Sequence, residues 1–265
     1  MPYCLDVPFG KRLRGSEEPN RRPGFLPYCP VHAITAVVPV LNEANHIRDC
    51  ISSLLKQPEI IEVIVADGGS ADETVDISRV NGAHVVQCHR QGRGIQIREG
   101  IQYAHADVIL VVHADCRLIA GAAGKLLRAL NTDSLVAGGA FRMSFASPNT
   151  GQWIISGLNN LRSKMTGISF GDQGQFVRNE ALDRIGGFPD QMLMEDVELS
   201  LRLMRAGRLV FLPRGIIASD RRWKTRPFIK GVTQILCLFG RYLFERRFGK
   251  IHEKAKNYHT RYYSE

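Results

Sequence analysis

The run Asp107-Val-Ile-Leu-Val-Val-His-Ala-Asp115 contains five consecutive apolar residues followed by a polar triplet. Short apolar runs rich in β-branched residues are typical of strands that are buried on both faces of a parallel sheet. Three similar runs precede it, so strands are predicted over 34–39, 60–66, 83–86 and 107–112. Between them, the spacing of apolar residues predicts helices around 47–55, over 71–80 and over 94–104. This alternation predicts an α/β fold with an open, mostly parallel sheet flanked by helices.

Polar and glycine residues collect directly after these strands. The carboxyl ends of parallel strands share one edge of an open α/β sheet, and ligands bind at that edge. We therefore expect four loops on one rim of the sheet: Asn42–Glu43, Asp67–Ser70, Gly92–Gly94 and His113–Asp115.

The pattern loosens after residue 115. We expect a strand over 138–145, a polar strand or loop over 170–178, helices over 179–185 and 195–205, and a strand over 208–212. Six prolines and no apolar period predict that residues 1–30 are an arm without regular structure. The basic and amphipathic residues 226–265 predict a helical extension, either packed on the core with a basic outer face or lying on a membrane.

The composition is that of an ordinary globular protein of 265 residues, with 44% hydrophobic and 23% charged residues. A net charge of +9 favours anionic partners such as nucleotides, phospholipid surfaces, nucleic acid or acidic sugars. The six cysteines form no C-x-x-C pair, so we expect a reducing compartment such as the cytoplasm. No stretch approaches the ~20 apolar residues of a membrane-spanning helix. The basic C-terminal segment would at most touch the inner face of the membrane.

Two of the rim loops carry residues suited to a nucleotide and a metal. Asp67 ends a buried strand before two glycines, where a carboxylate can accept hydrogen bonds from a base or ribose. The same Asp-Gly-Gly-Ser run is good turn chemistry, with Ser70 as the cap of the next helix, and both interpretations stay open. His113 and Asp115 lie on one side of an extended segment, so both could reach one Mn²⁺ or Mg²⁺ that bridges phosphate oxygens.

Three further segments could contact the ligand. Gly92-Arg-Gly94 opens a helix whose N–H groups attract phosphate, although Ile97 in place of a third glycine excludes a dinucleotide fingerprint. Glu195–Asp196 begin another helix, either as ordinary acidic residues at its positive end or as a general base whose pKa burial must raise. Ser219-Asp-Arg-Arg-Trp223 could bind a diphosphate and stack a sugar, or form a surface cation–π cluster.

Five motifs follow one another along the chain: Val38-Pro-Val-Leu-Asn-Glu43, Val65-Ala-Asp-Gly-Gly-Ser-Ala-Asp72, Gly92-Arg-Gly94, His113-Ala-Asp115 and Met194-Glu-Asp-Val-Glu-Leu-Ser200. In this order and spacing they resemble the motifs of family 2 glycosyltransferases, over residues 33 to 225. The resemblance implies the GT-A fold over 31–225, in which a nucleotide-binding half (31–117) is fused to a smaller acceptor-binding half (118–225).

The resemblance implies an inverting, metal-dependent enzyme that moves one sugar from a nucleoside-diphosphate sugar to a hydroxyl acceptor. That acceptor is unidentified and could be lipid-linked; no nucleic-acid partner is implied. Asp196 would be the general base, with Glu195 beside it as a second catalytic acid. Asp115 and His113 would bind the metal. The residues assigned to the donor site are Pro39, Asn42, Glu43, Asp67, Gly68, Arg93, Gly94, His113, Asp115, Arg222 and Trp223.

Three departures from the family pattern affect this interpretation. His113 replaces the first Asp of D-x-D, which leaves the metal's identity open. Asp67-Gly-Gly-Ser70 has one acid fewer than the usual Asp-Asp-Gly-Ser, so the nucleotide base need not be uracil. Ser219 replaces the Gln of Q-x-x-R-W, which favours transfer of a single sugar over polymer synthesis. The H-A-D triplet together with the run Phe170–Arg178 resembles a subgroup of small soluble bacterial members.

Two other functions remain as alternatives. A nucleotidyltransferase on a related fold typically carries glycine and a cation directly after the first strand, and the loop Val40–Asn45 has neither. A non-catalytic module that binds a nucleotide or a membrane is the second alternative, and His113 in place of a metal-binding Asp is its best support.

Overall fold

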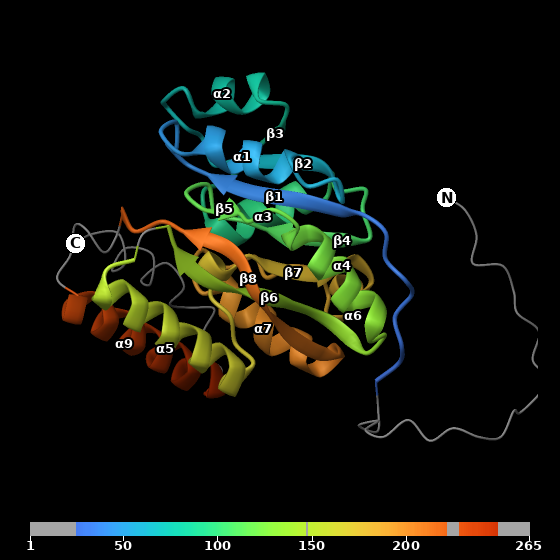
Figure 1. Cartoon of the computed structure of the whole chain (residues 1–265), viewed down its shortest axis with the longest axis vertical. Helices are drawn as coiled ribbons and strands as arrows, with labels where there is room; N and C mark the ends of the chain where they lie inside the picture. Colours follow the sequence, from blue (N-terminus) through green and yellow to red (C-terminus); the bar gives the residue numbers. More distant parts are fainter. Residues whose placement is uncertain (1–24, 147, 222–227, 249–265) are drawn as a thin grey trace, which may run out of the picture.

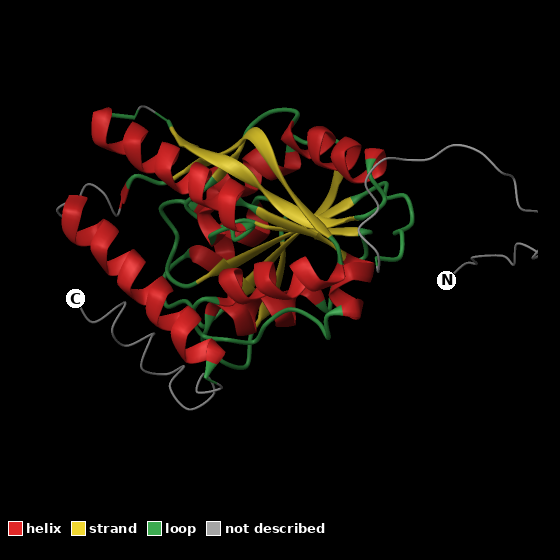
Figure 2. Ribbon diagram, turned by 90° about the horizontal axis from the view of Figure 1, so that it is seen from below, coloured by secondary structure: helices red, strands yellow, loops and turns green. Residues whose placement is uncertain are grey.

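In the computed structural model of this chain, residues 25–146, 148–221 and 228–248 are described. Their strands form an eight-stranded sheet in the order β3-β2-β1-β4-β7-β6-β8-β5 (Figure 1). Turned by 90°, the strands fan out between helices on either side (Figure 2). The predicted α/β architecture is confirmed.

Four parallel strands form the first half of the sheet: β1 (Ile34–Val40), β2 (Ile60–Asp67), β3 (His84–Gln87) and β4 (Val108–Val111). β1 pairs in parallel with β2 and β4, and β2 pairs in parallel with β3. All seven residues of β1 are buried, as its unbroken apolar run requires at the centre of a covered sheet. The connecting helices are α1 (Ile47–Leu55), α2 (Thr74–Val80) and α3 (Arg93–Ile101).

β4 joins the two halves of the sheet. It pairs in parallel with β1 on one side and antiparallel with β7 (Gln175–Arg178) on the other. β6 (Val136–Phe145) is antiparallel to β7 and parallel to β8 (Arg208–Ala218), which also pairs with the short β5 (Arg117–Leu118). Val111 of β4 lies opposite Gln175 of β7, so the residues before β7 reach the same edge as the loop after β4.

The second half also contains five helices and a 3-10 turn. They are α4 (Ala122–Thr132), α5 (Thr150–Thr166), the turn η1 (Gly171–Gln173), α6 (Asn179–Arg184), α7 (Glu195–Ala206) and α9 (Phe228–Arg247). The predicted strand over 138–145 and helices over 179–185 and 195–205 are confirmed. Helices α4 and α5 were not predicted, and β8 continues six residues beyond the predicted end at 212. It bends at Gly215, where an added Cβ would overlap the ring of Phe141.

Residues 25–30 of the predicted N-terminal arm run along the folded domain. Tyr28 is buried; its N–H donates to the Ser134 carbonyl and its hydroxyl to the Ala206 carbonyl, both at 2.8 Å. Arg178 fixes the same segment, because its guanidinium donates to the carbonyl of Cys29. Residues 1–24 of the predicted arm lie outside the described residues.

Helix α9 packs on α7 through the buried side chains of Leu238 and Tyr242. The Tyr242 hydroxyl donates to Glu198 Oε2 at 2.8 Å, and Arg246 pairs with the same carboxylate at 2.7 Å. This part of the C-terminal extension is therefore packed on the core. Among the described helices, none combines the length and the apolar character needed to cross a bilayer.

Candidate active site

The loops after β1 and β2 are joined by hydrogen bonds between them. The Asn42 N–H donates to Ser70 Oγ at 3.0 Å, and the Ala71 N–H donates to Asn42 Oδ1 at 2.8 Å. Asn42 has a φ of 56°, a left-handed conformation that asparagine adopts more readily than most residues. The Glu43 N–H donates to Thr74 at 2.8 Å. Two of the predicted rim loops therefore form one connected surface.

The carboxylate of Asp67 is held by its own turn. It accepts hydrogen bonds from the N–H groups of Gly69 and Ser70 at 3.1 Å and from the Ser70 hydroxyl at 2.6 Å. The turn interpretation is thus confirmed for the chain without a ligand. Ser70 does not cap the next helix, because its hydroxyl bonds Asp67; the N–H of Thr74 instead donates to Asp72 at 3.0 Å. Helix α2 accordingly begins at Thr74 rather than at residue 71.

Gln96 on α3 forms hydrogen bonds to the ends of both β1 and β2, a role that was not predicted from the sequence. Its buried side-chain Nε2 donates to the carbonyls of Val40 at 2.8 Å and Ala66 at 3.0 Å. Gly68 lies against it, and an added Cβ there would be 2.9 Å from the Gln96 amide. The sequence signal for this role is a polar residue between the apolar residues Ile95 and Ile97.

Arg221 connects two predicted ligand-binding carboxylates. Its guanidinium donates to both oxygens of Glu43, at 3.1 and 3.0 Å, and lies 3.7 Å from Oδ2 of Asp115. Its neighbours Arg222 and Trp223, which were predicted to contact the donor, lie outside the described residues. Arg221 thus supplies positive charge where the donor and its metal were predicted to bind.

His113 packs against the turn η1 from the other half of the sheet. An added Cβ on Gly171 would overlap the imidazole at Nε2, so glycine is required there. Nε2 is buried and has no hydrogen-bond partner among the described residues. Burial, followed by the charge of Arg93, lowers the pKa of His113 to about 4. The imidazole is therefore neutral.

Asp172, in the same turn, was quoted within the run 170–178 but received no role from sequence. Its Oδ1 is buried without a hydrogen-bond partner among the described residues. Burial, and then the negative charge of Asp196, raise the pKa of Asp172 to about 6, although Arg162 opposes this. The turn therefore adds a carboxyl group that is not held as an anion by hydrogen bonds.

The acidic pair at the start of α7 lies directly beside this turn. Asp196 accepts hydrogen bonds from the N–H groups of Gly171 and Val197, both at 2.8 Å. Glu195 is 1% exposed and forms an ion pair with Arg93. Burial raises the pKa of Glu195 to about 7, against the lowering effect of Arg93. At Glu195, burial thus outweighs the pairing with Arg93.

The start of α3 packs on the segment that leads into α7. The Gly94 N–H donates to the Gln191 carbonyl at 3.1 Å, and an added Cβ would overlap that oxygen. With the pair Arg93–Glu195, this contact brings the third rim loop to the acidic pair. Gly94 is therefore occupied by a protein contact rather than exposed as a phosphate-binding N–H.

The residues around Asp115 fit a divalent cation held together with a diphosphate. In the described parts of the chain, no three His, Cys, Asp or Glu side chains are grouped as metal ligands. A nucleotide-bound metal needs fewer, since phosphate oxygens and water complete its shell. Asp115 offers a partly exposed carboxylate, His113 is neutral, and the unpartnered oxygen of Asp172 adds negative charge.

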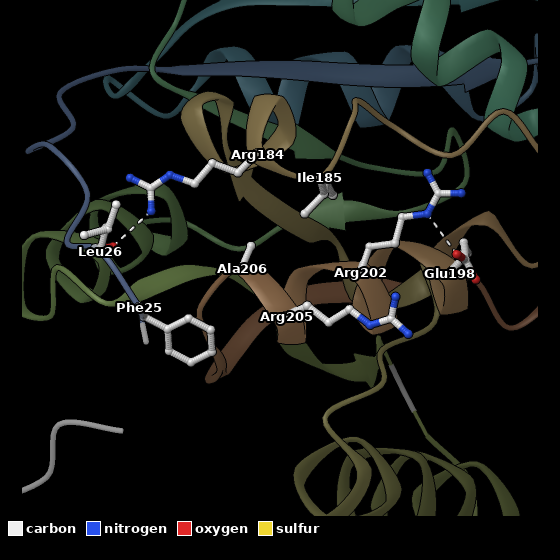
Figure 3. A pocket seen from close by; sticks show the side chains of 8 residues that line it. All are labelled: Phe25, Leu26, Arg184, Ile185, Glu198, Arg202, Arg205 and Ala206. Atoms are coloured by element: carbon white, nitrogen blue, oxygen red, sulfur yellow. Dashed lines mark hydrogen bonds and ion pairs between the residues drawn. The ribbon is translucent and has the colours of Figure 1, made fainter. Parts of the chain in front are cut away.

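A pocket of about 570 Å³ lies elsewhere, between Leu26, α6 and α7 (Figure 3). Arg184 points toward Leu26 and donates to its carbonyl at 3.0 Å, while Arg202 pairs with Glu198 at 2.8 Å. None of the predicted donor, metal or base residues lines this pocket. The candidate active site is therefore the open edge of the sheet rather than this cavity.

Comparison with known proteins supports a common fold. Glycosyltransferase AglE of Haloferax volcanii is 24% identical over 213 residues, 74% of this chain and 68% of that protein. Glycosyltransferase AglJ of the same organism is 34% identical over 96 residues. These residues are 36% of this chain and 31% of AglJ, and three mycobacterial relatives are matched over 44% of their length. The chain thus aligns with less than half the length of these four relatives.

Two solved structures resemble the fold at low identity. The mannosyltransferase PcManGT from Pyrobaculum calidifontis, in complex with GDP-Man and Mn²⁺, has a TM-score of 0.55 and 22% identity, covering 71% of this chain and 57% of that one. Glucosyl-3-phosphoglycerate synthase from Mycobacterium tuberculosis has a TM-score of 0.52 and 18% identity, covering 75% of this chain and 74% of that one. The fold is therefore the GT-A fold that the sequence predicted. The family model for glycosyl transferase family 2 matches residues 35–186, more than half of the chain, and the chain belongs to that family.

Proposed function

We propose that the protein transfers one sugar from a nucleoside-diphosphate sugar to a hydroxyl acceptor, with inversion at the anomeric carbon. The observation that carries this proposal is the position of Gly171. Its N–H holds the carboxylate of Asp196, and its Cα lies against the ring of His113. The predicted base in one half of the sheet is thereby brought beside the predicted metal ligands in the other half.

The donor would occupy the rim formed by the loops after β1, β2 and β4. Glu43 and Asp67 would meet the nucleoside, on the surface that Asn42 and Ser70 connect. Pro39 and Gly68 are buried and stay predicted contacts. Arg222 and Trp223 remain predicted contacts. PcManGT is in complex with GDP-Man and the synthase with UDP, so these relatives leave the nucleotide base open.

Asp115 and His113 would hold Mn²⁺ or Mg²⁺ at the diphosphate. Such a cation would supply positive charge that stabilises the leaving nucleoside diphosphate. Arg93 is close enough to influence the charge of His113 and would add to this field. Its pairing with Glu195 fixes its position before any donor binds.

Asp196 would accept the proton of the acceptor hydroxyl as that oxygen attacks the anomeric carbon. Two backbone N–H groups orient its carboxylate, and each oxygen keeps a further lone pair for the proton. Glu195 and Asp172 surround it with acidic groups whose pKa burial raises. We assign the nucleotide-binding half to residues 31–117 and the acceptor half to 118–225. The H-A-D subgroup and the cytoplasmic location stay predictions.

Thermal unfolding with UDP, GDP, CDP, ADP and dTDP, each with and without Mn²⁺ or Mg²⁺, tests the donor site. We expect one nucleotide to raise the Tm by several degrees only with metal, because a ligand that binds the folded state stabilises it. Asp115→Ala should abolish this shift. Asp190→Ala, at an exposed ion pair with Arg98, should keep it.

An absent shift for every nucleotide would count against the proposal and favour a non-catalytic module. If the protein instead consumed a nucleoside triphosphate and a sugar phosphate with release of pyrophosphate, it would be a nucleotidyltransferase.

A further inference from the structure

Helix α5 exposes a row of large apolar side chains. Their exposed fractions are 70% for Trp153, 43% for Ile154, 58% for Leu158, 54% for Leu161 and 77% for Met165. The last four follow the spacing i, i+4, i+7 and i+11, which places them on one face of the helix. Isolated exposed apolar residues need no explanation, but a contiguous stripe marks a contact surface.

Helix α9 extends the apolar character of this end of the molecule. Phe244 and Phe248 are 65% and 60% exposed, and their ring centroids lie 4.7 Å apart. Arg162 of α5 connects the two helices: its guanidinium lies 3.6 Å from the ring centroid of Phe170 and 5.8 Å from that of Phe239 on α9. Both helices lie at the end of the molecule opposite α2 and β3 (Figure 1).

The same two helices carry much of the positive charge. The sequence of α5 contains Arg162 and Lys164 and no acidic residue, a net charge of +2. That of α9 contains four basic residues and Glu245, a net charge of +3. Of these basic side chains, Lys164 and Arg247 are exposed, whereas Arg241 and Arg246 form ion pairs with Glu245 and Glu198. Apolar side chains beside basic ones are the combination that binds the interface of an anionic bilayer.

We propose that α5 and the exposed end of α9 form a docking surface for an anionic lipid bilayer, with α5 lying in the plane of the membrane interface. A second copy of the chain fits less well, because it would bring two net-positive faces together. Residues 1–24 and 249–265 each carry a net charge of +2 in the sequence, so neither terminus complements this surface.

The docking surface is connected to the candidate active site through Arg162. Its Nη1 donates to the Ile168 carbonyl at 3.0 Å, just before the turn η1. Docking would therefore hold the acidic side of the site close to the membrane, toward an acceptor embedded there. This last step rests on the proposed function, whereas the docking itself does not.

Trp153 is a built-in reporter of docking, since the chain has two tryptophans. In a Trp223→Phe protein, we expect vesicles of phosphatidylglycerol and phosphatidylcholine to shift Trp153 emission to the blue and brominated acyl chains to quench it. Phosphatidylcholine vesicles alone should bind much more weakly, and added salt should weaken the binding to anionic vesicles.

Replacing Leu158, Leu161 and Met165 together by serine should lower vesicle affinity about 100-fold, because less apolar surface enters the interface. Ile61→Ser with Val80→Ser is the matched control, since these side chains are 58% and 85% exposed on β2 and α2. Unchanged affinity in the triple variant would overturn the proposal. An absence of binding to anionic vesicles would also overturn it. So would the finding that the protein binds no vesicles but forms a dimer, and that the triple variant is a monomer.

Vesicle binding is measured without donor or metal, and the triple variant should keep the nucleotide-dependent thermal shift. The proposal of membrane docking and the proposal of donor binding can therefore be contradicted independently of each other.

Discussion

Asp67 and Asp172 are both carboxyl groups in loops of the candidate site, but their surroundings differ. Asp67, on the donor side, accepts three hydrogen bonds from its own turn. Asp172, on the acceptor side, keeps an unpartnered buried oxygen within the described structure and has a pKa raised to about 6. The turn at Asp67 is thus built from satisfied groups, which make a rigid surface. The turn at Asp172 belongs to a cluster of buried acidic groups whose burial costs stability, an arrangement typical of functional sites.

The largest effect is expected from Asp196→Asn on the acceptor side. Loss of the proton acceptor should reduce release of the nucleoside diphosphate from the donor by about 10²–10⁴-fold, the usual contribution of a general base. The nucleotide-dependent thermal shift should persist, because the donor side is unchanged. The two assays on the same preparation separate chemistry from binding.

Asp190→Asn is the matched control for Asp196→Asn, because Asp190 precedes α7 and forms an exposed pair with Arg98 at 3.0 Å. It should leave turnover within about twofold, since such pairs contribute little. Comparable turnover in Asp196→Asn and the control would remove Asp196 from the mechanism.

Arg93→Met should have the largest effect on stability. It leaves the buried carboxyl of Glu195 without its ion-pair partner, which costs about 3–5 kcal/mol of unfolding free energy when the group is charged. Because Arg93 lowers the pKa of Glu195, its loss raises that pKa beyond its value of about 7, so the destabilisation relative to the unchanged protein should grow as the pH rises past that value. Denaturant unfolding at several pH values measures it.

Adding Glu195→Gln to Arg93→Met should restore most of the lost stability, because no buried charge then remains to be paired. Glu195→Gln by itself provides the second measurement if Arg93→Met does not fold. A loss below about 1 kcal/mol at pH 8 in Arg93→Met would mean that the pair is solvated rather than buried.

The sequence predicted the parallel half of the sheet because its signals are local. An apolar run such as 107–112 identifies a covered strand wherever it occurs, and polar turns mark its ends. Helix α5 was missed for the opposite reason. Its apolar stripe points to solvent rather than to the core, and its buried residues include Gln152 and Ser163. Short β5, with two residues, has no readable period.

Candidate site residues could be named from the sequence where their role depends on a single loop. They were missed where their role depends on contacts among several segments. Asp196 stands out as an acid at a helix start. The unusual state of Asp172 comes from burial and from charges on α5 and α7, which no stretch of sequence reveals. Gln96 likewise acquires its role from carbonyls on two strands. Arg221 lies within the predicted segment 219–223, and Arg222 and Trp223 of that segment lie outside the described residues.

Asp67→Asn and Asp172→Asn should change stability in opposite directions, which tests the contrast between the two sides directly. Asn at position 67 has one acceptor oxygen for three donors, so about 1–2 kcal/mol should be lost at pH 7. The pKa of Asp172 is raised from 3.8 to about 6, so ionisation opposes folding, and stability falls as pH rises through this range. Asn there removes the charge and should add about 1–3 kcal/mol at pH 7 in metal-free protein.

The gain from Asp172→Asn should shrink as the pH falls from 6 through 3.8 and vanish below about pH 3, where the carboxyl group is protonated in both the folded and the unfolded state. If both variants were destabilised equally at pH 7, Asp172 would be held by hydrogen bonds in the same way as Asp67. The turn at Asp172 would then stabilise the fold in the same way as the turn at Asp67, rather than take part in proton transfer.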